Sequence, residues 1–160
     1  MLRRALAALF LIAIVTGVAL ATPVPVLALT DGVTSRVVWL DDGDRYVYAY
    51  VNSVYDAEVE ERHLRSNDRL RITSVRSSDI KAVEYFGWTG DIRQVAGGWE
   101  EDAPRNEQRR LEIRITPRYR QRLSGPRWTV DLAAVYGDGI VLVTAERVPV
   151  ITALLRGWRP

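Results

Sequence analysis

The sequence predicts an all-β fold, an antiparallel β-sandwich or a partly open barrel of seven to eight strands, preceded by an N-terminal transmembrane anchor or signal helix. Three observations support this. Short runs of alternating apolar and polar residues recur along the chain. Clusters of Gly, Asn, Asp, Ser and Pro separate them. No long amphipathic helical period follows residue 28, and 160 residues suit one domain, at residues 29–160.

Residues 1–28 have the composition of a targeting or anchoring segment. Arg3 and Arg4 form a positive flank, and the chain then carries no charge up to Thr30. A membrane span needs roughly 20 apolar residues. Ala19-Leu20-Ala21 matches a small-x-small cleavage site, and Ala28 offers a weaker one. We therefore expect a single-pass anchor or a cleaved signal peptide, and in either case a domain outside the cytoplasm.

The first strands are predicted at residues 33–40 and 45–52. In the second, Tyr46, Tyr48 and Tyr50 alternate with small aliphatic residues, which favours a central strand buried on both faces. Residues 41–44 read Asp-Asp-Gly-Asp. They lack the spacing of a calcium loop, so a hairpin turn is expected and no metal site is assigned.

Further strands are predicted at residues 54–64, 69–75 and 80–86, with a turn at 65–68. A Gly-rich connection follows at residues 87–98. Trp88 and Trp99 lie in or beside it, and they are expected either to line a pocket or membrane surface or to cap one end of the β-core.

The C-terminal part predicts strands at residues 111–116, 128–136 and 140–146. Gly137-Asp138-Gly139 forms the hairpin turn between the last two, and residues 118–126 form a polar connection. Residues 149–158 suit a short helix or a last strand, apolar enough to lie on the domain or on a bilayer surface.

Charge and composition exclude several classes of function. Lys and Arg total 22 against 20 Asp and Glu, so without Arg3 and Arg4 the domain is close to neutral. A nucleic-acid-binding domain would carry an excess of positive charge, so no nucleic acid is expected. The chain has no cysteine and one histidine, His63, which excludes thiolate and multi-histidine metal sites. No cofactor is expected.

Two sets of residues were weighed for catalysis. His63 follows Glu58, Glu60 and Glu61, but no Gly-x-Ser-x-Gly nucleophile elbow accompanies it, so a structural role is expected. Asp56, Glu58, Glu60 and Glu61 form an acidic run in which Glu58 and Glu60 share a strand face. A carboxylate-based hydrolase is one interpretation, and a solvated strand face is the other. No catalytic residue is assigned.

Arginines suggest a binding surface. They are Arg105, Arg109, Arg110, Arg114, Arg118, Arg120, Arg122 and Arg127. Guanidinium groups bind carboxylates and phosphates with paired donors, so this set would face an anionic small molecule, anionic lipid or an acidic partner. Pairing with the acidic residues of 41–61 is the alternative.

Asn52-Ser53-Val54, the acidic residues 58–61, and Leu70-x-Ile72-x-x-Val75 followed by Ser77 and Ser78 resemble an uncharacterised family. It is the domain-of-unknown-function family eighteen-fifty, often encoded beside TAXI-type tripartite (TRAP) transporters. Asn52 stands where the family has a histidine, and the family's Gly-Ala-Gly loop is missing. The resemblance implies a small, membrane-anchored β-domain associated with solute uptake, without catalytic activity.

The sequence therefore predicts a non-enzymatic accessory module that binds a membrane transporter subunit or its solute-binding protein. A binding domain for an anionic small molecule and a carboxylate-based hydrolase are the alternatives. The residues expected to bind the ligand or partner are Arg109, Arg110, Arg114, Arg118, Arg120, Arg122, Trp88, Trp99, Asn52 and Ser53.

Overall fold

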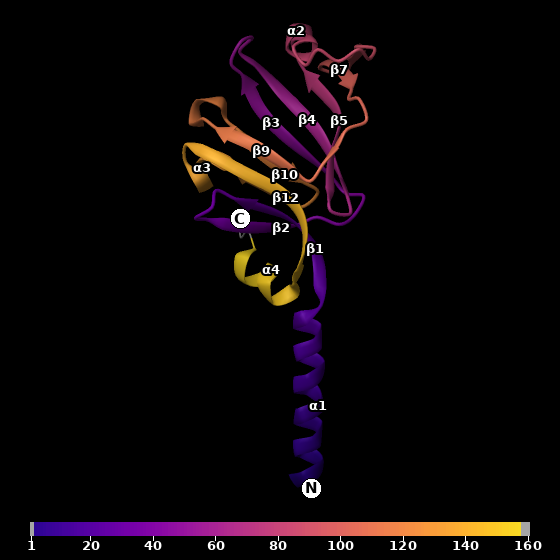
Figure 1. The fold of residues 1–160 in the computed structure, drawn as a ribbon, viewed down its shortest axis with the longest axis vertical. Helices are drawn as coiled ribbons and strands as arrows, with labels where there is room; N and C mark the ends of the chain where they lie inside the picture. The colour runs from indigo at the N-terminus through magenta and orange to yellow at the C-terminus, as the bar shows by residue number, and fades with distance from the viewer. Residues whose placement is uncertain (1, 158–160) are drawn as a thin grey trace.

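The computed structural model describes residues 2–157, with the backbone alone at residues 2–5, 7 and 8. A helix, α1 (Leu2–Ala21), projects from a body built mostly of antiparallel strands (Figure 1). The described strands number twelve and form two sheets. The expectation of a β-rich domain behind an N-terminal helix is confirmed. Among the described residues, no helix combines the length and apolarity needed to cross a membrane.

The smaller sheet has four strands in the order β2 (Ser35–Trp39), β1 (Pro23–Thr30), β12 (Gly139–Pro149) and β9 (Arg110–Ile115). Strand β1 pairs with β12 over its whole length. Its residues Val26, Leu27, Ala28 and Leu29 are all buried, because both faces of this strand are covered.

The larger sheet has eight strands. Its central part is β3 (Arg45–Asn52), β4 (Ala57–Ser66) and β5 (Arg69–Ser77). Strands β10 (Arg122–Gly125) and β11 (Trp128–Asp131) continue the sheet beyond β3. Strands β7 (Gly98–Asp102) and β6 (Arg93–Val95) continue it beyond β5, and β8 (Glu107–Gln108) also pairs with β5. The tyrosine strand β3 is central, as predicted.

The main hydrophobic cluster takes residues from both sheets, such as Leu27, Leu29 and Val143 from the smaller and Tyr46 and Leu123 from the larger. A second cluster lies where α2 (Ile80–Glu84) covers β4 and β5, around Val59, Val75 and Val83. A third lies on the other face of the smaller sheet, where α4 (Val150–Arg156) covers β1 and β2. Figure 1 shows α2 at the end of the body far from α1, and α4 at the end from which α1 leaves.

A buried arginine links the two sheets. The side chain of Arg65 on β4 is 2% exposed. Its guanidinium donates to the carbonyl oxygens of Val26 at 2.9 Å, Leu40 at 2.6 Å and Glu146 at 2.8 Å. Desolvation lowers the pKa of Arg65, and the nearby carboxylate of Asp42 opposes that shift. Each of the three guanidinium nitrogens thus donates at least one hydrogen bond, since Nε also donates to the Asn67 carbonyl oxygen at 3.1 Å, and this buried cation fixes the position of β4 against β1 and β12.

Several elements differ from the sequence prediction. Residues 2–157 form twelve strands rather than seven to eight, because residues 23–30 and the connections around residues 93–108 and 122–125 also pair as strands. The described body also begins at Pro23, ahead of the boundary expected at residue 29.

One predicted strand, 80–86, is largely helical, and a second, 128–136, is a strand followed by a helix. Residues 80–84 form α2, because the Asp79 carboxylate accepts from the Lys81 N–H at 2.8 Å and so caps a helix. Likewise Asp131 accepts from the Ala134 N–H at 3.0 Å and caps α3 (Leu132–Tyr136) within the predicted strand 128–136. Residues 150–156 of the C-terminal stretch form the helix α4, and Trp158 lies outside the described residues. A single 3-10 turn, η1 (Pro117–Tyr119), follows β9.

Candidate functional site

A row of alternating charges crosses the outer face of the larger sheet. Residues two apart on a strand share a face, so Glu58, Glu60 and Arg62 of β4 point the same way. The strand register then sets Glu60 opposite Arg76 of β5, Arg76 opposite Glu100 of β7, and Glu100 opposite Arg93 of β6. Opposite charges directly across neighbouring strands stabilise a sheet.

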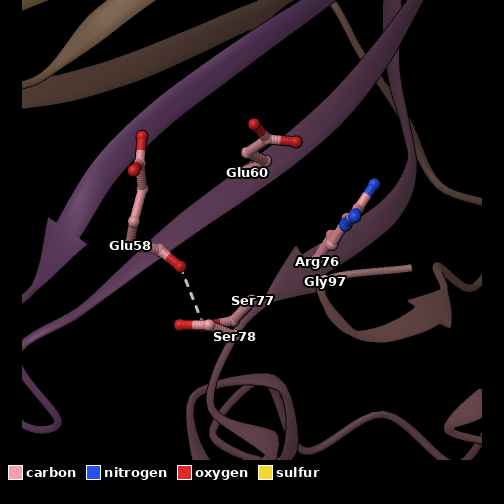
Figure 2. A pocket seen from close by; sticks show the side chains of 6 residues that line it. All are labelled: Glu58, Glu60, Arg76, Ser77, Ser78 and Gly97. Atoms are coloured by element: carbon pink, nitrogen blue, oxygen red, sulfur yellow. Dashed lines mark hydrogen bonds between the residues drawn. The ribbon is translucent and has the colours of Figure 1, made fainter. Parts of the chain in front are cut away.

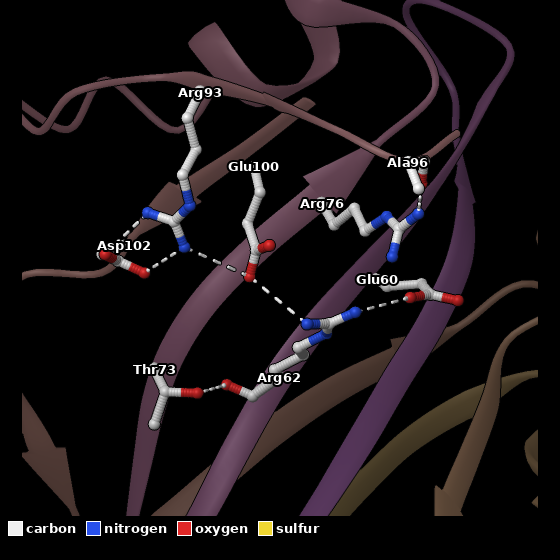
Figure 3. A network of polar contacts seen from close by, with 8 residues as sticks. All are labelled: Glu60, Arg62, Thr73, Arg76, Arg93, Ala96, Glu100 and Asp102. Carbon is white, nitrogen blue, oxygen red and sulfur yellow. Dashed lines mark hydrogen bonds and ion pairs between the residues drawn. The ribbon is translucent and has the colours of Figure 1, made fainter. Parts of the chain in front are cut away.

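Four of these side chains, Glu60, Arg62, Glu100 and Arg93, form a network of ion pairs, whereas Arg76 donates to the Ala96 carbonyl oxygen (Figure 3). Glu100 Oε1 lies 3.3 Å from Arg62 Nη1 and 3.7 Å from Arg93 Nη2, and the Glu100 side chain is only 11% exposed. Arg93 also holds Asp102 with two hydrogen bonds of 2.8 and 2.9 Å. This bidentate contact lowers the pKa of Asp102 and raises that of Arg93. The buried carboxylate is thus compensated inside the chain, as a buried charge must be.

A cavity of about 260 Å³ opens beside this network, lined by Glu58, Glu60, Arg76, Ser77, Ser78 and Gly97 (Figure 2). The two glutamates face the cavity from β4, and Arg76 faces it from β5. The Ser77 hydroxyl donates to the Glu58 carbonyl oxygen at 2.8 Å. The cavity therefore presents two carboxylates and one guanidinium to a small ligand.

One wall of this cavity depends on glycine. Gly97, in the turn before β7, and Gly98, the first residue of β7, have φ angles of 79° and 154°. A Cβ atom at Gly98 would lie 2.2 Å from the Ser77 carbonyl oxygen. Only glycine allows the turn to approach β5 so closely.

Glu58 and Glu60, the two carboxylates of the hydrolase hypothesis, both line this cavity. The side chains of Glu58 and Glu60 are 52% and 38% exposed, and each lies beside an arginine: Glu58 pairs with Arg122, and Glu60 lies 3.9 Å from Arg62. Neither carboxyl is enclosed by apolar side chains of the kind that surround a general acid. The arrangement suits ionic recognition better than acid catalysis.

The arginines predicted to form a binding patch lie on separate surfaces. Arg110 and Arg114 are exposed on β9 of the smaller sheet, whereas Arg122 pairs with Glu58 on the larger sheet. Arg109 is exposed just before β9, and Arg120 follows η1. Arg118 lies 4.8 Å from the ring centre of Tyr119. Of the predicted set, only Arg122 contacts a residue of the cavity wall.

Asn52 and Ser53 belong to the turn between β3 and β4. Asn52 is 5% exposed, and its Oδ1 accepts from the N–H groups of Val54 at 2.9 Å and Tyr55 at 3.3 Å. Its amide oxygen is therefore used to close the turn. Ser53 is exposed beside it.

Trp88 and Trp99 are half-buried and pack against the cluster beneath α2. The rings of Trp88 and Phe86 are 5.0 Å apart. Neither tryptophan lines the cavity, and their packing matches the second sequence interpretation, a cap on one end of the β-core.

His63 is part of the interior. It is 1% exposed, its ring stacks on Tyr46 at 4.9 Å, and its Nε2 lies 3.3 Å from Glu61 Oε2. Burial raises the pKa of Tyr46, and it raises that of Tyr48 to about 12. The Tyr48 hydroxyl accepts from Gln121 Nε2 at 2.7 Å. This buried aromatic cluster stabilises the core.

The acidic residues 41–44 form a turn in which the Asp44 N–H donates to the Asp41 carbonyl oxygen at 3.1 Å. Within residues 2–157, no group of His, Asp and Glu side chains is arranged to hold a metal ion.

Sequence reasoning found Glu58 and Glu60 but missed Arg76, Glu100 and Arg93. Arg93 and Glu100 have a weak sequence signal, because β6 and β7 are short and lie in or beside a Gly-rich connection. Arg76 lies on β5, and only the pairing of β5 with its neighbours brings it to the site. Comparison with protein-family models, curated proteins and solved structures found no match to this chain.

Proposed function

We propose that the chain is a non-enzymatic accessory module, attached to a membrane through its N-terminal segment, whose extracytoplasmic β-domain binds a transporter subunit or its solute-binding protein. The observation that carries the proposal is the exposed apolar surface of α1. Eight of its large apolar side chains are 46–69% exposed: Leu6, Leu9, Phe10, Leu11, Ile12, Ile14, Val15 and Val18. Hydrating such a surface is unfavourable, since burying one such side chain gains about 1.5–3 kcal/mol.

The start of the β-domain limits where a signal could be cleaved. Cleavage after Ala21 would leave β1 whole, because this strand begins at Pro23. Cleavage after Ala28 would remove most of β1 from between β2 and β12. We therefore propose that α1 is either retained as an anchor or removed after Ala21.

The rest of the proposal combines architecture, charge and resemblance. We infer that the two sheets form a β-sandwich around their shared hydrophobic cluster. The near-neutral charge and the ion-paired carboxylates favour binding over catalysis. The resemblance to family eighteen-fifty favours a transporter as the partner, and we propose the face around Glu60 and Arg76 as the surface that meets it.

The test is affinity purification of the full-length protein from membranes in mild detergent. A co-purifying transporter subunit, lost when Glu60→Arg and Arg76→Glu are made singly, supports the proposal. Glu84→Arg, at an exposed position on α2, is the matched control and should retain the partner. Recovery of the protein without any transporter component, or in the cytosolic fraction, contradicts it.

A second candidate function is small-molecule binding, favoured by the cavity itself. Its carboxylates and guanidinium suit a ligand carrying both an ammonium and a carboxylate group. Calorimetric titration with a panel of amino acids, and with carboxylic acids of the same size that lack the amine, tests this. Binding of the amino acids alone, weakened by both Glu60→Gln and Arg76→Gln, supports it, and heat from neither set contradicts it.

A further inference from the structure

The C-terminal helix α4 presents apolar side chains to solvent on the side away from the sheet. Its Ala153 is fully buried against Val26, Ala28 and Val37 of the smaller sheet. Its Ile151, Leu154 and Leu155 are 41%, 53% and 77% exposed. A short amphipathic helix normally turns such residues inward, so this exposed face has no partner within the described chain.

Two backbone contacts fix the position of α4. The Val150 N–H donates to the carbonyl oxygen of Thr22 at 3.0 Å, and Gly157 forms a parallel bridge with Val37 of β2. Thr22 joins α1 to β1, so α4 begins at the point where α1 leaves the body (Figure 1). The exposed apolar face of α4 is therefore held beside the root of α1.

The other exposed large apolar side chains of the described chain come from different elements or loops, one from each: Val33, Trp39, Val54, Tyr85 and Ile140. Single exposed apolar residues are normal on a protein surface, whereas adjoining ones mark an interaction site. In the described chain, only α1 and α4 carry several each, and the two helices are in contact. Arg156, the last residue of α4, is exposed beside this face and would reach lipid phosphates.

We infer that the exposed face of α4 is a membrane-contact surface that enters the boundary between lipid head groups and acyl chains. A lipid bilayer is the occupant favoured here, because the apolar surface of α4 continues that of α1 and the exposed Arg156 lies at its edge. Interfacial helices combine these features. The inference rests on the proposed membrane attachment and adds to it a second contact, which sets the orientation of the β-domain on the membrane.

The chain has no cysteine, so single cysteines report on single positions. We would label Leu155→Cys and Leu154→Cys with a polarity-sensitive fluorophore in the full-length chain. The vesicles would contain phosphatidylcholine and phosphatidylglycerol, with or without brominated acyl chains. Val54→Cys is the matched control, since Val54 is 59% exposed in the turn after β3. All three positions are exposed, so folding is expected to be unaffected.

The inference predicts a blue shift and a loss of emission with brominated lipid at positions 154 and 155, and neither at position 54. Water-like emission at 154 and 155 in chains that float with the vesicles overturns the inference while leaving membrane attachment intact. Chains that do not float contradict the attachment as well. A parallel sample of unlabelled Leu155→Cys chains is treated with a mild thiol oxidant. Disulfide-linked dimers there, with no lipid quenching in the labelled sample, assign the surface to a second copy and overturn the inference.

Discussion

Two regions of the molecule have opposite surfaces. The outer face of the larger sheet carries charges that are paired with one another, and the end formed by α1 and α4 carries exposed apolar side chains. On the sheet, Glu100 is enclosed by two arginines of the same chain and Arg93 also holds Asp102, so the charges are satisfied internally. At the other end, Leu155 on α4 and Phe10 on α1 are 77% and 69% exposed among the described residues.

The difference concerns what each region requires from outside. A partner on the charged face must exchange existing ion pairs for new ones, which favours weak and reversible recognition. The apolar end gains free energy simply from leaving water, which favours lasting attachment. We therefore propose that the α1–α4 end attaches the protein to the membrane and that the outer face of the larger sheet recognises a partner.

The largest effect is expected from Arg65 on β4, which joins the larger sheet to β1 and β12 of the smaller sheet. Arg65→Met leaves four carbonyl oxygens without their donor, and we expect a loss of about 3–5 kcal/mol in the free energy of unfolding. Urea denaturation measures it. Arg69→Met, on an exposed side chain at the start of β5, is the control and should cost under about 1 kcal/mol. Equal losses for the two variants would show that Arg65 does not link the sheets.

The next effect concerns the wall of the cavity. Gly98→Ala places a methyl group on the Ser77 carbonyl oxygen, so we expect a loss of about 2–3 kcal/mol in unfolding free energy and weaker binding at the cavity. Gly43→Ala is the matched control, because Gly43 also has a positive φ, of 84°, but nothing lies within 4 Å of the new Cβ. It should cost about 1 kcal/mol. A smaller loss for Gly98→Ala than for Gly43→Ala contradicts the close approach of the turn.

Within the charged network, burial should decide the size of each effect. Glu100→Gln leaves Arg62 and Arg93 facing a neutral side chain that is 11% exposed, and we expect a loss of about 1–3 kcal/mol. Asp102→Asn, on a side chain 68% exposed, should lose less. Denaturation of both variants in the same buffer measures the difference, and a larger loss for Asp102→Asn would reverse the interpretation.

The Asp102 contact also predicts a pH dependence. Because Arg93 lowers the pKa of Asp102 below its usual 3.8, folding stabilises the ionised form. Its contribution is present above about pH 4 and is lost as the pH falls through the lowered value. The urea midpoint of the wild-type chain should therefore fall more steeply below pH 4 than that of Asp102→Asn. Parallel curves would show that the pair does not shift this carboxyl.

The smallest effect on stability is expected at the apolar end. Leu155→Ser removes a side chain that packs on nothing, so the free energy of unfolding in water should change by less than about 0.5 kcal/mol. In the presence of vesicles, the same change should speed hydrogen exchange of the α4 amides while leaving α1 unaffected. Strong destabilisation in water would mean that α4 packs against the body through Leu155.

Apolar–polar alternation in the sequence correctly predicted the strands whose burial shows in their own residues. The alternation of Tyr46, Tyr48 and Tyr50 identified the central strand, because a strand buried on both faces shows its period in its own residues. Residues 80–84 and 132–136 fall in predicted strands but form helices. A single capping aspartate at the start of each outweighs β-propensity over so short a stretch. Residues 23–30 lacked charge for a different reason from the one inferred: β1 is buried on both faces.

The candidate site shows the same limit. Glu58 and Glu60 could be found together, since they are two residues apart on one strand. Arg76 and Glu100 join them only through pairing between strands, and the register of β5 with β7 leaves no trace in either segment alone. The arginines grouped by sequence lie on both sheets, because neighbouring positions on a chain that changes sheet between β9 and β10 face different surfaces.

Hydrogen exchange of the full-length chain, measured with and without phosphatidylcholine–phosphatidylglycerol vesicles, tests the division between the two regions most directly. We expect slower exchange on adding vesicles in α1 and α4, and unchanged exchange in β4, β5 and at Gly97 and Gly98. Slower exchange at those glycines and strands, with α4 unchanged, would contradict this division.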